Sequence, residues 1–144
     1  RVVPRVNDLE KEFAKLNLDP YQMFGATGDK IYDRAVIKEA GQWIKQVVIP
    51  RIDSREYNAM TYREKKVAMS NNMSTALSAA RAIVQGDMTS KDKERVDKMA
   101  YNRLSQQRRL AINDMYKRDK GVTLEDAKDY ASVYEYAARL EGLR

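Results

Sequence analysis

Basic side chains are the residues whose type and spacing come closest to a chemical task in this sequence. Residues 103–109 read RLSQQRR, and three further cations follow on the same predicted helix. Arginine and lysine contact phosphates, and glutamine can contact base edges, so this segment is a candidate nucleic-acid contact. The candidate contact residues are Arg103, Arg108, Arg109, Lys117, Arg118 and Lys120.

A solvated helix surface explains the same segment without a ligand, and it is the favoured interpretation. Residues 61–120 hold 14 basic and 7 acidic side chains, but Asp114 and Asp119 dilute the charge of the candidate segment itself. Arg103 and Arg108 also lie on different faces of a helix. No helix-turn-helix, RRM or KH signature is present. We therefore expect nucleic acid to bind weakly and without sequence preference.

Acidic side chains cluster where helices are predicted to begin. Negative charge stabilises the first turn of a helix, which favours capping over catalysis or metal binding. Residues 25–30, GATGDK, lack the GxxxxGK[ST] spacing of a phosphate loop. Residues 91–98, KDKERVDK, alternate in sign and predict a surface helix. The acidic clusters are Asp8, Glu10 and Glu12, and Glu125, Asp126 and Asp129.

The composition excludes several classes of chemistry. The chain has no histidine and no cysteine, so it lacks the usual neutral-pH general base, the commonest zinc ligand and every thiolate site. We expect a protein that is not an enzyme and that uses no cofactor or metal. No window approaches the ~20 apolar residues that span a bilayer. The 144 residues suit one domain, and Arg1 in place of methionine favours a fragment of a longer chain.

Apolar residues recur at helical spacing nearly everywhere, and no alternating stretch predicts a strand. The sequence therefore predicts an all-α bundle of about five helices with short connections. Pro50 is expected to kink or end the second helix, which makes a Pro-kinked helical hairpin with the third. Gln107 and Arg108 interrupt the apolar stripe of the fourth helix and allow a break near residues 105–107. The expected helices span about 8–18, 33–49 with a short turn to 60, 61–86, 89–120 and 123–142.

Sequence signals also mark the helix ends. Asn7 with Glu10, and Thr61 with Glu64, have the spacing of capping boxes. Pro20 is expected to stop the first helix, and Asp53 or Ser54 to cap the short turn that follows Pro50. Gly86 and Gly121 are predicted to end the third and fourth helices. Thr123, with Asp126 three residues later, opens the fifth.

Small and aromatic residues on the predicted helices mark a candidate interface. Gly41 inside the second helix favours close approach of a neighbour, and the alanine-rich side of the third helix does the same. Trp43 and Ile44 are expected to be buried against the third helix. Tyr130, Tyr134 and Tyr136 are interpreted as core and rim residues rather than as a stacking surface. The candidate interface residues are Gly41, Trp43, Ala76 and Ala80.

Residues 32–82 hold an ordered set of features: Tyr32, Asp33, Gly41, Val48, Ile49, Pro50, Ser54, Tyr57, Glu64, Lys65, Lys66, Ala80, Arg81 and Ala82. In this order they resemble a helical region of the large internal virion and DNA-ejection proteins of tailed bacteriophages. The resemblance covers about a third of the chain. It implies a segment of a very long phage polypeptide, carried inside the particle or in its tail, and it transfers no catalytic residue.

Two functional expectations follow from different classes of protein. The first is a non-enzymatic structural or interaction module of a phage virion protein that packs against other virion chains or against itself. The alternative is a helical nucleic-acid-binding module that uses residues 103–120. The expected location is the phage particle, or otherwise the cytoplasm of the bacterial host.

Overall fold

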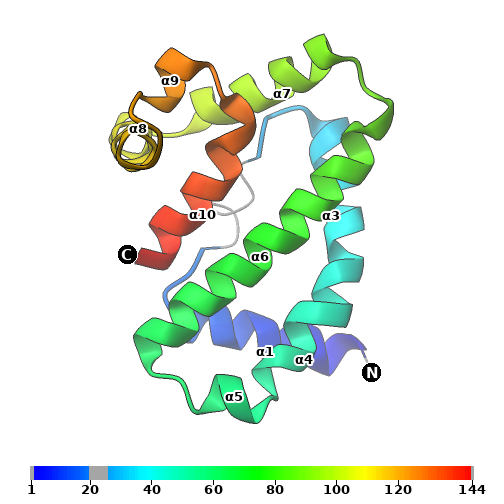
Figure 1. Ribbon diagram of the computed structural model, residues 1–144. Helices are drawn as coiled ribbons and strands as arrows, with labels where there is room; N and C mark the ends of the chain where they lie inside the picture. Colours follow the sequence, from blue (N-terminus) through cyan, green and yellow to red (C-terminus); the bar gives the residue numbers. More distant parts are fainter. Residues whose placement is uncertain (1, 20–25, 144) are drawn as a thin grey trace.

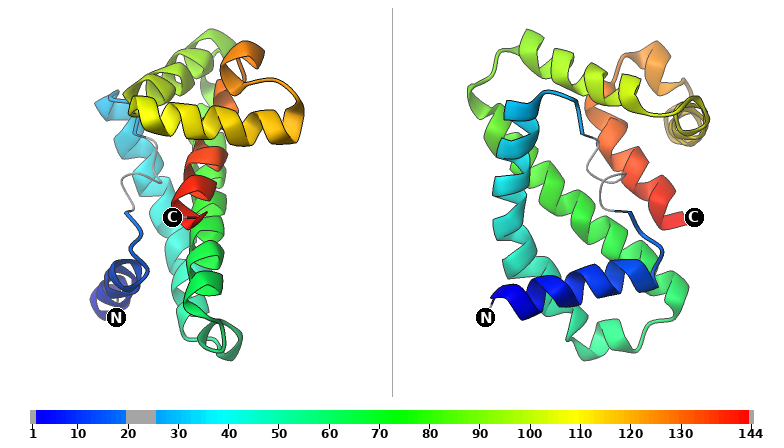
Figure 2. Two further views of the ribbon diagram at one scale, coloured as in Figure 1. Left: turned by 90° about the vertical axis from the view of Figure 1, so that its left-hand side faces the viewer. Right: turned by 180° about the vertical axis from the view of Figure 1, so that it is seen from behind.

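The described residues of the computed structural model, 2–19 and 26–143, contain helices and no strand, so the all-α prediction is confirmed. Side chains are described for residues 8–19 and 26–143. The scaffold is an antiparallel pair of helices, α3 (Lys30–Trp43) and α6 (Tyr62–Val84). Helix α1 (Val2–Lys15) lies across one end of this pair, and α7 (Ser90–Arg103) lies across the other (Figures 1 and 2).

The predicted kink at Pro50 is not confirmed. A π-helical turn, Ile44–Val48, follows α3 directly, and α4 (Ile49–Ile52) continues through Pro50. Proline lacks the backbone N–H, and that loss matters least in the first turn of a helix, where Pro50 stands in α4. Ser54 then caps the short helix α5 (Arg55–Asn58), as expected, and the chain turns into α6.

Local capping chemistry was predicted well from Thr61 onward. The Thr61 hydroxyl accepts from the Glu64 backbone N–H at 3.2 Å, and the Thr61 N–H donates to the Glu64 carboxylate at 2.9 Å. Gly121 ends α8 (Gln106–Lys120) in the left-handed conformation, with φ +85°. Ser105 caps α8 after α7 has ended at Arg103, which confirms the break in the predicted fourth helix.

Three predicted helix ends are wrong. Helix α1 begins at Val2, so Asn7 lies inside it and cannot cap it. Its C-terminal end is at Lys15, and the turn after it uses Asn17 with φ +55° well before Pro20. Gly86 lies in a 3₁₀ turn, Gln85–Asp87, and is not among the glycines with positive φ.

The predicted fifth helix is divided in two. Thr123 caps α9 (Leu124–Ala127), and Lys128 then adopts φ +53°, which ends that helix after four residues. A 3₁₀ turn, Tyr130–Ser132, leads into α10 (Val133–Leu143), which packs along α6. The structure thus contains more helices than the five expected.

The described side chains form three hydrophobic clusters along the scaffold. One joins α1 to α4, α5 and the first half of α6, and another joins α3 to the second half of α6 and to α7. The last lies among α7, α8, α9 and α10. In the second cluster Ala40 and Ala80 are fully buried, so α3 and α6 meet through small side chains and approach closely.

The glycine that permits close approach is Gly142, whereas the prediction named Gly41. A Cβ atom on Gly142 would lie 2.9 Å from the Ser70 hydroxyl and 3.0 Å from the Ser70 Cβ, so α10 and α6 touch at this point. A Cβ atom on Gly41 would meet nothing within 4 Å. Gly41 therefore has no close neighbour among the described residues, and its assignment to an interface with another chain stays a prediction.

Buried tyrosines connect the helices through their hydroxyl groups. The Tyr101 hydroxyl donates to Glu125 at 2.6 Å, and that of Tyr136 donates to Asp119 at 2.7 Å. The rings of Tyr130, Tyr134 and Tyr136 are all buried, which confirms their assignment to the core. Because a hydroxyl at the end of an apolar ring needs a partner once it is buried, each such contact fixes one helix against another.

Trp43 contradicts the prediction that it is buried, because 37% of it is exposed. Ile44 is half-buried and packs against two of the clusters, so that part of the prediction holds. We therefore expect Trp43→Ala to lower the free energy of unfolding, measured by urea titration, by less than a core truncation does, because more than a third of Trp43 is already in water. The control, Leu77→Ala in the core, is expected to cost about 2–5 kcal/mol. A similar loss for both variants would contradict the exposed position of Trp43.

Candidate functional site

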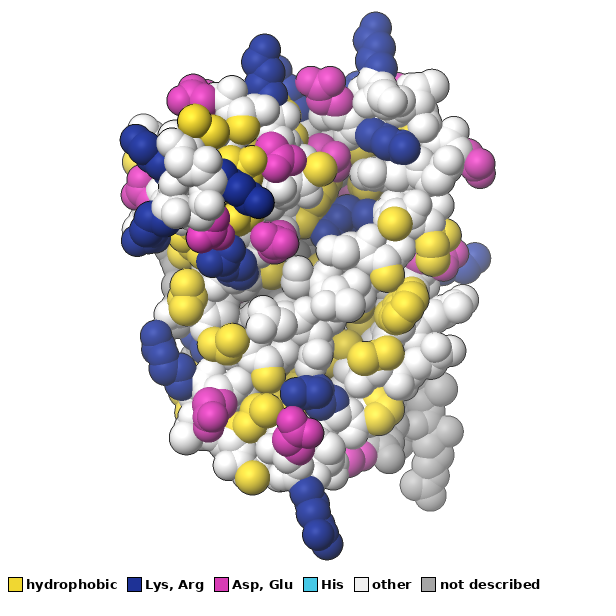
Figure 3. All heavy atoms as spheres, in the orientation of Figure 1, with side chains coloured by type: hydrophobic (Ala, Val, Ile, Leu, Met, Phe, Trp, Pro, Cys, Tyr) yellow, Lys and Arg dark blue, Asp and Glu magenta, His cyan; other side chains and the backbone are white. Residues whose placement is uncertain are grey.

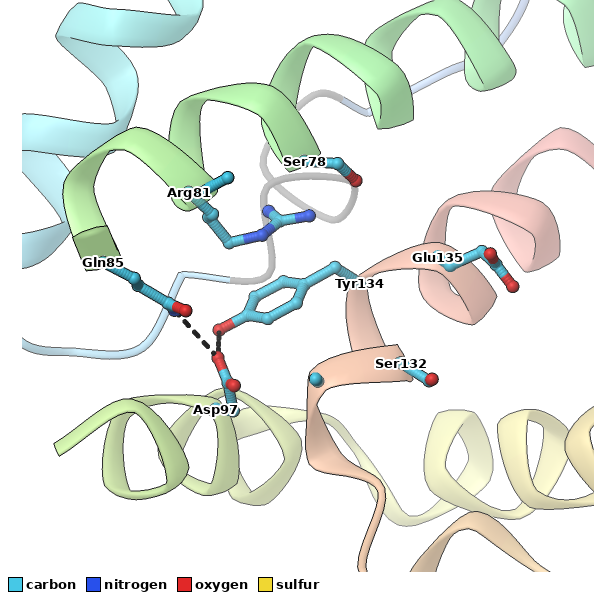
Figure 4. A pocket seen from close by; sticks show the side chains of 9 residues that line it. Ser78, Arg81, Gln85, Asp97, Ser132, Tyr134 and Glu135 are labelled. Carbon is cyan, nitrogen blue, oxygen red and sulfur yellow. Dashed lines mark hydrogen bonds between the residues drawn. The ribbon is translucent and has the colours of Figure 1, made fainter. Parts of the chain in front are cut away.

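A cavity of about 300 Å³ lies between the end of α6, α7 and the beginning of α10. Figure 4 shows its polar side chains converging from these three helices, with the Tyr134 ring between Arg81 and Asp97. The capped start of α6 sets the register that turns Arg81 inward, one turn after the buried Leu77. The cavity is lined by Ser78, Arg81, Ala82, Gln85, Asp97, Ala131, Ser132, Tyr134 and Glu135.

Arg81 is the unusual residue of this site because it is charged and only 6% exposed. Its guanidinium lies over the Tyr134 ring, with Cζ 3.6 Å from the ring centroid. Its NH1 nitrogen is buried and has no hydrogen-bond partner. None of the ion pairs between described residues involves Arg81. Burial lowers the pKa of Arg81 from its ordinary value, and the stacked ring partly compensates the buried charge.

A hydrogen-bonded chain holds the other side of the cavity. The Tyr134 hydroxyl donates to Asp97 Oδ1 at 2.8 Å, and Gln85 Nε2 donates to the same oxygen at 3.3 Å. Gln85 Nε2 also lies 2.7 Å from the Tyr32 hydroxyl. Burial raises the pKa of the Asp97 carboxyl, while the hydrogen bonds from Tyr134 and Gln85 lower it. Burial together with the neighbouring Asp97 raises the pKa of Tyr134.

This arrangement suits binding. It offers an unpaired guanidinium N–H and a buried carboxylate on opposite sides of the Tyr134 ring, so it can hold a ligand by charge and hydrogen bonding. Within the described residues, no group of three or more acidic side chains is placed to hold a metal ion. In the same part of the chain, no helix has the length and apolar character needed to cross a bilayer.

The candidate nucleic-acid residues fall into two groups: two of them make contacts inside the protein, and the others are exposed. Arg108 forms an ion pair with Glu141 of α10, and their side chains are only 16% and 6% exposed. Arg109 donates from NH1 to two carbonyl oxygens at the end of α7. Asn102 lies in the last turn of that helix, and Leu104 follows it. These two arginines hold helices together. The remaining candidates are exposed side chains, Arg103, Lys117, Arg118 and Lys120.

Nucleic acid is expected to bind weakly, with a dissociation constant around 10⁻⁴–10⁻⁶ M near physiological salt and a steep loss at higher salt. Replacing Lys117, Arg118 and Lys120 with glutamine should weaken binding equally for all sequences, since these side chains contact phosphates. Fluorescence anisotropy with duplex and single-stranded oligonucleotides measures both effects. Submicromolar binding at about 150 mM salt that these substitutions abolish would reverse the ranking of the two functions.

The candidate interface residues also divide into two groups. Ala76 and Ala80 are 2% and 0% exposed. They face the interior of this chain, where Ala80 packs in the cluster that joins α3 to α6, so they are closed to a partner. Trp43 remains accessible, together with Val47 four residues later, which is 45% exposed. Figure 3 shows hydrophobic side chains exposed on the face of the molecule where α3 and α6 lie side by side.

Sequence reasoning missed the cavity because its charged members look like surface residues. Asp97 lies in the segment predicted to be a solvated helix face, but it is only 5% exposed. Arg81 was noted only as part of the family resemblance. A helical projection carries a usable signal, since Arg81 follows Leu77 at i+4 and Asp97 adjoins the buried Val96. A charged residue on or beside an apolar stripe is the sign of a buried polar site.

Comparison with protein-family models, with curated proteins and with solved structures finds no match for this chain.

Proposed function

We propose that this chain is a non-enzymatic helical interaction module of a bacteriophage virion protein, of the internal or DNA-ejection kind. It acts by helix–helix packing with other chains of the particle. The resemblance of residues 32–82 to such proteins supports the phage assignment. These residues form most of the α3–α6 scaffold (Figure 1).

The observation that carries the proposal is the exposed pair of Trp43 and Val47. Residues four apart lie side by side on a helix, so the two side chains form one apolar surface. Their exposed fractions are 37% and 45%. Gln42 and Gln46, which precede them, are exposed and uncharged. A tryptophan beside an aliphatic residue is a common anchor of protein interfaces.

Ile83 of α6 is a separate exposed apolar side chain, at the end of the scaffold where α6 meets the start of α3. It is 55% exposed and lies three residues after Ala80, which packs against α3. A helix from another virion chain can cover Trp43 and Val47 at the C-terminal end of α3. The fitting partner is an amphipathic helix with apolar residues at i, i+4 and i+7.

Particles purified from the host that encodes this chain test the proposal. We expect mass spectrometry to find its peptides in the particle at a constant ratio to the other structural proteins. Cross-linking from the exposed Lys45 should then reach a second virion chain. Absence of the chain from purified particles would exclude the virion assignment, and cross-links confined to this chain would exclude the interaction.

The interaction surface is tested separately with a matched pair of variants in the full-length parent protein. Val47→Glu places a charge on the exposed apolar surface and should abolish incorporation into particles without loss of helical structure. Glu56→Gln, at an exposed position on α5, is the control and should leave incorporation unchanged. Equal incorporation of Val47→Glu and the unmodified chain would show that this surface is not used.

A further inference from the structure

The cavity between α6, α7 and α10 contains an unsatisfied buried donor. Arg81 is more than nine-tenths buried, lines the cavity and has no hydrogen-bond partner at NH1. An unpaired donor of a buried charged group is costly, because the group has lost its water without gaining a partner. A ligand with an acceptor at this point restores the missing hydrogen bond. A planar carboxylate is the acceptor that a guanidinium binds best.

The acidic side chains of the cavity favour a ligand that carries a positive group as well as a carboxylate. Asp97 and Glu135 line the same space, so two carboxylates accompany the one guanidinium. A bare anion bound to Arg81 is repelled by both. A ligand that carries a positive group beside its carboxylate removes this repulsion and pairs with the acidic side chains. Asp97 Oδ1 is already occupied by Tyr134 and Gln85, so the carboxylate is held in place before a ligand arrives.

The size and walls of the cavity limit the rest of the ligand. A volume of about 300 Å³ is at the lower end of the range for small-molecule sites. The methyl groups of Ala82 and Ala131 supply apolar contacts, and Ser78 supplies a hydroxyl. In Figure 4 the Arg81 guanidinium and Ser78 lie on the α6 side of the cavity, opposite Ser132 and Glu135. The space suits a compact ligand with a short side chain.

We propose that this cavity binds the zwitterionic head group of a small α-amino acid, with the carboxylate on Arg81 and the ammonium group toward Glu135 on the opposite wall. The binding is non-covalent. It is independent of the docking surface on α3, because no residue of that surface lines the cavity. The chain is thus expected to carry a small-molecule site in addition to its interaction surface.

NMR titration of the folded chain tests the proposal with defined probes. Glycine and L-alanine carry both charges, acetate carries the carboxylate alone, and methylammonium carries the cation alone. We expect saturable shifts of the Arg81 side-chain N–H and the Tyr134 ring with glycine and alanine. Their affinity should be at least tenfold higher than that of acetate or methylammonium. Equal affinities for glycine and acetate, or no saturation by glycine, would overturn the proposal.

Two variants and a control separate a specific site from general charge effects. Arg81→Gln removes the guanidinium and should abolish the glycine response, with folding checked by circular dichroism. Glu135→Gln alters an exposed side chain and should leave the fold intact. It therefore tests the binding site even if Arg81→Gln does not fold. The Glu135→Gln variant should lower the affinity for glycine at least threefold, and the affinity for acetate should stay the same or rise. Arg118→Gln, exposed on α8, should change nothing. Unchanged glycine affinity in Glu135→Gln would contradict the proposed orientation.

Discussion

Glu141→Ala is expected to lower the free energy of unfolding by about 3–5 kcal/mol, the usual cost of removing one partner from a buried ion pair. Glu141 is 6% exposed at its side chain and pairs with Arg108, so the substitution leaves a poorly solvated guanidinium without its carboxylate. The contact joins α8 to α10, and its loss should loosen the last helix before the scaffold. Urea denaturation followed by circular dichroism measures the effect.

Two further variants make this test specific. Arg95→Ala breaks ion pairs with Asp92 and Asp29 in which the Arg95 side chain is 51% exposed, and it should cost less than about 1 kcal/mol. The double variant Arg108→Met with Glu141→Leu fills the site with apolar groups and should recover most of the stability. A loss for Glu141→Ala no larger than that for Arg95→Ala would show that the Arg108 pair is solvated in solution.

The second large effect is expected at alkaline pH. Burial raises the pKa of Tyr57 and Tyr134, and the neighbouring carboxylates Glu12 and Asp97 raise both further. Burial and the hydrogen bond to Asp119 raise the pKa of Tyr136 to about 12. The unfolded chain loses these protons near pH 10, whereas the folded protein keeps them. The stability they contribute is therefore complete below pH 10 and is lost as the pH rises from 10 toward the folded pKa values.

The size of the alkaline effect follows from proton linkage. Each tyrosine that stays protonated only in the folded state lowers the free energy of unfolding by about 1.4 kcal/mol per pH unit. Urea titrations between pH 10 and 12 measure how the free energy of unfolding changes with pH. We expect a slope that corresponds to at least two protons released per molecule on unfolding. Tyr134→Phe should reduce that slope by about one proton, because the Tyr134 hydroxyl is bound to the buried Asp97. A stability that stays constant from pH 9 to 12 would contradict the buried, hydrogen-bonded tyrosines.

Local chemistry explains which parts of the fold the sequence could predict. The helix caps at Thr61, Ser105 and Gly121 bond to groups only a few residues away in the chain. The sequence around each cap therefore suffices to predict it. The all-α class follows from the same short-range spacing. Asn7 failed as a cap because the helix begins six residues earlier than predicted, at Val2 rather than at Asp8. Pro50 was read as a kink because the π-helical turn before it has no recognisable sequence signal.

Side-chain contacts between distant segments could not be predicted in this way. The helix containing Trp43 has apolar residues on a broad face, and only the position of α6 decides that Val48 is buried and Trp43 is exposed. The partner of Arg108 is 33 residues away. Arg81, Asp97 and Tyr134 come from three helices that no local pattern places together. The helices were therefore predictable, whereas the cavity and the ion pair required the fold.

The most direct test of the proposed interaction uses Trp43, which is the single tryptophan of the chain. Replaced by 5-fluorotryptophan, it gives one ¹⁹F NMR resonance with no background from unlabelled partners. On addition of chains from dissociated particles, we predict a shifted and broadened resonance that loses its solvent isotope effect, because a partner helix covers the ring. The same titration with the Val47→Glu variant should leave the resonance unchanged. An unaltered signal from the unmodified chain at saturating partner concentration would contradict the proposal that this surface docks another virion chain.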